Sequence, residues 1–154
     1  MTHGDDDGII LPPRIASAHI VLLPIFRKEK DRQSVMQYTE NLAKTLREKS
    51  YSGRHIVVEI DSREIGGARG WDWIKKGIPI RVEIGPRDIA SDSVFIARRD
   101  KGIKEKESIG REQFISQLTD MLDDIQKNLF NRALDFRKKH TVRMDGREEF
   151  TDFF

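Results

Sequence analysis

Apolar and polar residues alternate strictly along residues 78–85, which predicts a strand with one face in a hydrophobic core. On the polar face, Arg81 and Glu83 stand two residues apart, and a Gly-Pro-Arg-Asp turn follows. Hydrogen-bond donors and acceptors that alternate on a rigid strand suit recognition of unpaired bases. An ordinary amphipathic edge strand with a solvated face is the commoner explanation of such a pattern.

Three further patterns predict a parallel crossover upstream of this strand. Residues 19–25 are a continuous apolar run, typical of a strand that is buried on both faces. Residues 31–49 have apolar side chains at helical spacing, which predicts a helix that ends at a segment of serine and glycine. Residues 55–60 form a second apolar run, which predicts a second strand. A strand, helix and strand in this order predict a right-handed parallel βαβ unit.

Downstream, the pattern changes to an antiparallel hairpin and a helix. Residues 93–99 are predicted to pair antiparallel with the central strand. Residues 104–108 fit either a short edge strand or a solvated loop. From residue 111 to about residue 139, apolar side chains through Phe136 form a wide stripe on one long helix, which is expected to cover the sheet. The fold class is therefore α/β with a mixed sheet.

Between the second strand and the central strand lies a segment with three glycines and both tryptophans of the chain. The glycines at 66, 67 and 70 lack the lysine and hydroxyl residue of a phosphate-binding loop, so a flexible entry to a short helix is the simpler interpretation. Trp71 and Trp73 cannot share a face of that helix. We expect Trp73 in the core and Trp71 exposed, where it could stack on a base.

Composition limits the alternatives. The 154 residues fit one domain, 35% of them are charged, and the formal net charge is only +2. Absence of cysteine excludes disulfides and thiolate metal sites, and no apolar run is long enough to span a membrane, which is compatible with a cytoplasmic location. Between residues 69 and 104, nine basic residues outnumber five acidic ones, a pattern that favours phosphate contact but also fits a charged surface without a partner.

No catalytic constellation stands out. The four histidines are scattered without metal-ligand spacing, and the two that open predicted strands, His19 and His55, are interpreted as structural. Adjacent carboxylates at residues 5–7 point in different directions on an extended chain, so no metal site is predicted, and residues 1–8 are expected to be unstructured or peripheral. These residues indicate a binding domain rather than an enzyme.

Several long motifs resemble the anticodon-binding domain of class II prolyl-tRNA synthetases of the eukaryotic and archaeal-like type. The motifs are HGDDDGIILPPRIA at 3–16, LLPIFRK at 22–28, W-x-x-KGIPIRVEIGPRD at 73–88, ARRD at 97–100 and NLFNRALDFRKKHT at 128–141. The resemblance implies a sheet of about five strands with helices on its faces. It also implies three segments: a linker from a missing catalytic core at 1–17, the anticodon-binding domain at 18–140, and the truncated start of a C-terminal module at 141–154.

The resemblance also implies a function and a site. The parent enzyme would be a homodimer that activates proline with ATP and magnesium and loads it on its tRNA, whereas this fragment would hold no cofactor and be inactive alone. Its partner would be the anticodon stem-loop of proline tRNA, with no DNA or membrane partner. The family positions that contact the bases correspond to Arg81, Arg87, Asp88 and Lys104, and Glu83 is a neighbouring acceptor on the same strand. The basic residues expected along the RNA backbone are Lys75, Lys76, Arg98, Arg99 and Lys101.

One departure from the family pattern concerns base recognition. The family commonly has W-E-L-K-G before the central strand, and here Ile74 stands where that glutamate is expected. Asp72 or Glu83 could replace the missing acceptor. Two other functions remain open: an accessory or dimerisation module of the same fold that associates through the helix at 111–139, and a small nucleotide-binding enzyme that uses the glycine loop.

Overall fold

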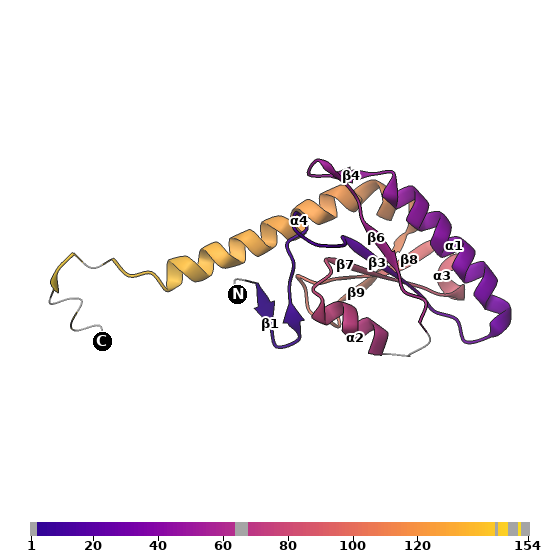
Figure 1. Ribbon diagram of the computed structural model, residues 1–154, viewed down its shortest axis with the longest axis horizontal. Coiled ribbons are helices and arrows are strands. Elements are labelled where there is room, and N and C mark those ends of the chain that lie inside the picture. Colours follow the sequence, from indigo (N-terminus) through magenta and orange to yellow (C-terminus); the bar gives the residue numbers. More distant parts are fainter. Residues whose placement is uncertain (1–2, 64–67, 144, 148–150, 152–154) are drawn as a thin grey trace.

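A five-stranded mixed sheet forms the centre of the computed structural model, which describes residues 3–63, 68–143, 145–147 and 151 (Figure 1). Its strand order is β6-β3-β7-β8-β9. The strands are β3 (Ile20–Pro24), β6 (Val58–Ile60), β7 (Ile80–Ile84), β8 (Ser93–Arg98) and β9 (Lys106–Gly110). The predicted mixed sheet is confirmed.

The two halves of the sheet differ in strand direction. β3 lies between β6 and β7 and is parallel to both, which satisfies its backbone on both sides and explains its uninterrupted apolar sequence. α1 (Glu29–Arg47) connects β3 to β6, and α2 (Ala68–Lys75) precedes β7. β8 pairs antiparallel with both β7 and β9, as the predicted hairpin requires.

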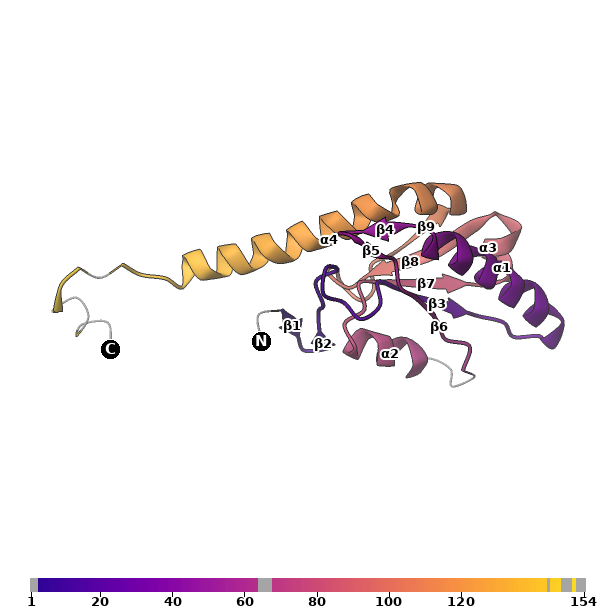
Figure 2. The same ribbon diagram turned by 45° about the horizontal axis from the view of Figure 1, so that its top comes forward.

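Helices cover the two faces of the sheet unequally. In Figure 2, α1 and α4 (Arg111–Lys139) lie on one side of the sheet, whereas α2 lies on the other. The main core fills the α1–α4 side, with fully buried residues such as Leu22, Val82 and Phe114. A smaller cluster under α2 joins Val21 and Leu23 of β3 to Trp73. The α2 side over β7, β8 and β9 is therefore only partly covered.

The long helix α4 covers the sheet only with its first part, up to Leu129. Its buried side chains run from Phe114 to Leu129, and beyond them α4 extends away from the sheet (Figure 1). Phe130 and Phe136 are 63% and 65% exposed, and the ring of Phe136 stacks on His140. The expectation that Phe136 belongs to the stripe that covers the sheet is therefore wrong, because the sheet ends before the helix does.

Several predicted boundaries need correction. The helix expected at 31–49 is α1 at 29–47, and the strand expected at 55–60 is shortened to β6. Its first residue, His55, belongs instead to a separate hairpin of β4 (Ser50–Tyr51) and β5 (Arg54–His55), whose turn residues Ser52 and Gly53 both have positive φ. The expected glycine stop is thus a hairpin turn. The turn after β7 is the short helix α3 (Pro86–Ala90), and the edge strand starts at residue 106 rather than 104.

The N-terminal segment forms an ordered hairpin, so the expectation that it is unstructured is wrong, whereas its exposed residues agree with a peripheral position. β1 (Gly4–Asp5) and β2 (Gly8–Ile9) form a hairpin beside the end of α2. The N–H of Leu11 donates to the carbonyl of Gly77, 3.1 Å away. Gly77 has φ of +71°, and a Cβ there would lie 2.7 Å from the carbonyl oxygen of Ile9, so the close approach requires glycine. The division into segments at 1–17, 18–140 and 141–154 stays a prediction.

Candidate nucleic-acid interface

A groove of about 660 Å³ opens on the partly covered side of the sheet, near the ends of β3 and β7. Arg81 and Glu83 of β7 lie on the sheet side of the groove, because odd-numbered residues of this strand point away from the main core. Trp71 and Ile74 of α2 line it on one side and Lys106 of β9 on the other. The ends of parallel strands are the usual place for ligands in open α/β sheets.

Arg81 is the most unusual residue of the groove. It is only 4% exposed, although its side chain lines the groove. No hydrogen bond or ion pair joins its guanidinium to another residue in the described part of the chain. Burial lowers the pKa of Arg81, and the nearby Glu83 offsets part of this effect. A desolvated cation with free donors is a strong binding site for an acceptor-rich ligand.

Glu83 and Lys106 form an ion pair across the groove. The Nζ atom of Lys106 lies 2.6 Å from Oε1 of Glu83 and 5.8 Å from the centre of the Phe95 ring. Phe95 of β8 is opposite Glu83 in the antiparallel register, and it is half-buried. Lys106 was missed by sequence reasoning, because only the β8–β9 register brings it beside the central strand.

A buried carboxylate fixes α2, the helical wall of the groove. Asp61 follows β6, is 5% exposed, and accepts hydrogen bonds from Nε1 of Trp73 at 2.7 Å and from Arg63 at 2.7 and 3.0 Å. The hydrogen bonds from Arg63, and after them the one from Trp73, hold the pKa of Asp61 well below its usual range. Arg69 donates to the carbonyls of Asp61 and Pro24, each 2.9 Å away. The wall is therefore tied to the ends of β3 and β6.

The two tryptophans lie in different environments, as predicted. Trp73 packs against the smaller core cluster, and Trp71 is 47% exposed at the groove. Ile74 is 4% exposed and also lines the groove, so an apolar side chain occupies the place where the resemblance implies a glutamate. Asp72 is engaged with Arg63 at 3.2 Å and is not among the residues that line the groove, whereas Glu83 is.

The remaining residues predicted to contact bases lie outside the groove. Asp88 accepts a hydrogen bond from the N–H of Gly85 at 2.8 Å and so caps α3. Arg87 is exposed on α3, and Lys104 is exposed in the turn before β9. None of the three lines the groove, although Ile103 next to Lys104 does. Their contact with bases stays a prediction.

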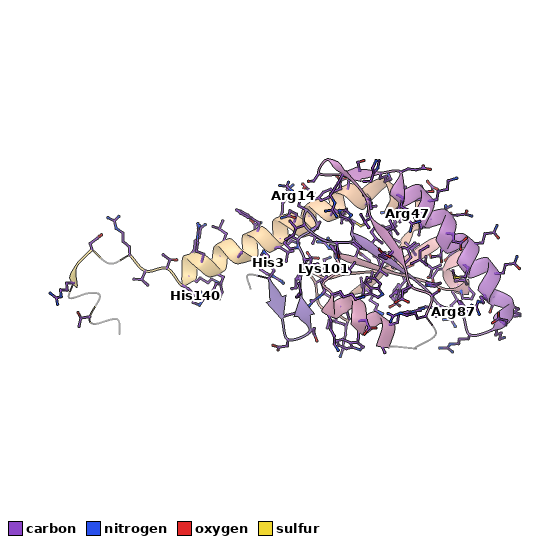
Figure 3. All side chains as sticks on the ribbon, viewed as in Figure 1. His3, Arg14, Arg47, Arg87, Lys101 and His140 are labelled. Atoms are coloured by element: carbon purple, nitrogen blue, oxygen red, sulfur yellow. The ribbon has the colours of Figure 1, made fainter. Side chains whose placement is uncertain are left out.

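The five residues predicted along the RNA backbone divide into two groups. Lys75, Lys76 and Lys101 are exposed, with Lys76 placed 4.2 Å from the centre of the Trp73 ring. Figure 3 shows Lys101 and Arg87 far apart, at opposite ends of the sheet.

Arg98 and Arg99 are buried and engaged by acids of the same chain. Arg98 pairs with Asp100 and Asp124 at 2.8 and 2.7 Å, and Arg99 makes two bonds of 2.5 Å to Asp5. Both guanidinium groups are thus satisfied internally, which favours a structural role over phosphate contact.

Other candidate chemistry receives no support from the described residues. They contain no group of three or more metal-ligating side chains and no helix long and apolar enough to cross a membrane. His19 is fully buried, accepts a hydrogen bond from the N–H of Val57 at 3.0 Å, and has its pKa lowered to about 4 by burial, as suits the structural role predicted for it. His55, the second histidine predicted to open a strand, is exposed in β5. Of the glycine loop, Gly70 lies in α2, and the glycines at 66 and 67 lie outside the described residues.

Comparison with known proteins identifies the family. A family model described as an anticodon binding domain matches residues 19–121, which include all five strands of the central sheet and the first part of α4. The chain belongs to this family. It is 41% identical to a proline–tRNA ligase of Bdellovibrio bacteriovorus and 44% identical to one of Protochlamydia amoebophila, in each case over 100% of the chain and 31% of the relative.

A third relative, the proline–tRNA ligase of Pyrococcus abyssi, is 40% identical over 96% of the chain and 29% of the relative. The resemblance to prolyl-tRNA synthetases stated from the motifs is thus confirmed. The chain spans about a third of the length of these relatives.

Proposed function

We propose that this domain reads the anticodon of proline tRNA in the groove between α2 and β9, and so positions the tRNA for an ATP- and magnesium-dependent, homodimeric, cytoplasmic proline–tRNA ligase. The observation that carries the proposal is Arg81, a buried arginine at the groove without a protein partner among the described residues. Family membership and relatives that are proline–tRNA ligases support the choice of RNA.

The chemistry of the groove fits an extruded guanine. Arg81 can donate to the O6 and N7 acceptors of guanine, and Glu83 can accept from the N1 and N2 hydrogens of a second guanine or of the same one. For this, the 2.6 Å ion pair between Glu83 and Lys106 must open or tilt, which releases the ammonium of Lys106 for a neighbouring acceptor. Trp71, exposed on the wall, offers a ring face on which a base can stack.

The environment of Arg81 favours a role in binding over a role in stability. Burying most of an arginine without hydrogen bonds costs free energy, since its donors lose part of their water and gain no protein acceptor. Replacement by glutamine shortens the side chain and removes the charge, so we expect the free energy of unfolding to stay unchanged or rise. A bound guanine supplies the missing acceptors and offsets this cost only in the complex.

The test compares Arg81→Gln with Lys101→Gln, an exposed basic residue that does not line the groove. Each variant is titrated with an anticodon stem-loop that carries UGG and with one in which both guanines are replaced. Arg81→Gln should lose about 1–3 kcal/mol for the UGG stem-loop and reduce the ratio of the two dissociation constants. Lys101→Gln should leave that ratio at the wild-type value. Equal ratios for Arg81→Gln and wild type would overturn the proposal.

A further inference from the structure

The cations around the groove differ in whether the protein already satisfies them. Six basic side chains line it: Arg27, Lys28, Arg63, Arg69, Arg81 and Lys106. Three are engaged, because Arg63 pairs with two aspartates, Arg69 donates to backbone carbonyls, and Lys106 pairs with Glu83. Arg27, Lys28 and Arg81 have no hydrogen bond or ion pair from their side chains to any other described residue.

These three free cations occupy different environments. Arg81 is buried in the groove, where a flat base edge can reach it. Arg27 and Lys28 are exposed at the rim, on the segment that leads from β3 into α1. An exposed cation at a rim is strongly hydrated and suits a solvated phosphate better than a buried base.

The N-terminus of α1 adds backbone donors at the same rim. Lys28 is its N-cap residue, and no side chain caps the helix. The N–H groups of Glu29 and Lys30 have no hydrogen-bond acceptor among the described residues, whereas the N–H of Asp31 donates to the carbonyl of Lys28 at 3.0 Å. Helix α1 has 19 residues, so its dipole is fully developed at this end.

One acidic side chain at the rim, that of Glu29, would repel an anion. The carboxylate of Glu29 lines the groove, but one of its oxygens lies 3.6 Å from Arg32, which offsets part of its charge. The free side chains of Arg27 and Lys28 leave the rim net positive. Arg81, buried and without a partner among the described residues, independently indicates that this groove holds a ligand.

We infer that Arg27, Lys28 and the uncapped N-terminus of α1 bind a backbone phosphate of the RNA strand whose base enters the groove at Arg81. This inference rests on the proposed function and adds the direction of the strand. The RNA backbone passes over the β3–α1 rim at the carboxyl ends of the parallel strands. Binding of this phosphate does not depend on Lys75 and Lys101, which are exposed near the amino-terminal end of β7.

The test measures how the dissociation constant of the 154-residue chain for the UGG stem-loop changes with salt between about 0.05 and 0.3 M. Arg27→Gln/Lys28→Gln is compared with the matched control Lys75→Gln/Lys101→Gln, which removes the same number of charges. A cation on a single-stranded phosphate contributes about 0.7 to the slope of log K against log salt. The rim variant should lower the magnitude of the slope by about 1.4, and the control by less than half as much.

A single methylphosphonate in the loop sharpens the result. At the phosphate that the rim holds, it should weaken wild-type binding and cause no further loss in Arg27→Gln/Lys28→Gln. An unchanged slope in the rim variant, or a larger loss in the lysine control, would overturn the inference. If wild type does not discriminate guanines while the rim variant still loses slope, the phosphate site stands and base reading fails. Absence of any RNA binding at low salt contradicts both.

Discussion

Arg99 ties three segments together, and its removal offers a quantitative test of the fold around the groove. Its side chain is 1% exposed and makes two bonds of 2.5 Å to Asp5 in the N-terminal hairpin. It also donates to the carbonyl of Gly8 at 3.1 Å and to that of Ile74 in α2 at 3.2 Å. Arg99 thus holds the hairpin and the groove wall to the end of β8.

The expected cost of Arg99→Met follows from these contacts. Breaking a buried ion pair by removing one partner costs about 3–5 kcal/mol. The Asp5 side chain is 40% exposed, so water recovers part of its solvation, while two carbonyls lose a donor. Methionine fills the space of the aliphatic stem. We therefore expect the free energy of unfolding to fall by about 2–4 kcal/mol.

Urea unfolding followed by tryptophan fluorescence measures this loss directly. Both tryptophans of the chain lie in α2, so the signal also reports the wall that Arg99 holds. Asp5→Asn, alone and combined with Arg99→Met, gives the coupling energy, which we expect at about 1–2 kcal/mol. Arg137→Met, on the exposed part of α4, should stay within about 0.5 kcal/mol of wild type. The reasoning is refuted if Arg99→Met is as stable as this control.

Three further predictions concern pH, backbone strain and the tryptophans. Burial lowers the pKa of His19 from 6.5 to about 4, so the unfolded chain binds more protons between these values. Unfolding free energy should therefore fall by up to about 3 kcal/mol as the pH drops from 7 to 4, and His19→Gln should abolish this part of the pH dependence. In thermal unfolding, Gly77→Ala should lower the free energy of unfolding by about 1–3 kcal/mol, because Gly77 has a positive φ and its Cβ would meet the carbonyl of Ile9 in β2. The control Gly70→Ala, where a Cβ meets no atom, should raise it by about 0.5–1 kcal/mol, because alanine favours the helical conformation of α2. Trp73→Ala should lower the free energy of unfolding by about 2–4 kcal/mol, because Trp73 packs in the smaller core cluster. Trp71→Ala should weaken RNA binding by about 1–3 kcal/mol and leave the unfolding midpoint unchanged, because Trp71 is exposed.

Local patterns predicted most of the fold because burial is periodic within each element. The run at 19–25 predicted β3, because a strand buried on both faces is apolar at every position. The alternation at 78–85 predicted β7, because one face of a half-buried strand repeats every second residue. Boundaries were less certain: the residues after α1 read as a helix stop, but they form the β4–β5 hairpin. That hairpin has only two residues in each strand, too few for a periodic signal.

The site was harder to predict because its properties arise from distant contacts. Alternation placed Arg81 on a polar face, but its burial depends on packing across a groove that α2 and β9 complete. Arg98 and Arg99 belong to a basic window in the sequence, yet their acidic partners include Asp124 and Asp5, on α4 and in the N-terminal hairpin. Such pairing cannot be read from charge counts in one window.

The most direct test of anticodon reading is a titration of the unmodified chain with two stem-loops at about 0.15 M salt. One carries the UGG anticodon, and the other has both guanines replaced. Because each well-formed guanine contact is worth about 1–3 kcal/mol, the UGG stem-loop should bind at least about tenfold more tightly. Equal affinity for the two stem-loops, with the same steep salt dependence, would contradict base reading and leave only a basic surface that attracts RNA without regard to sequence.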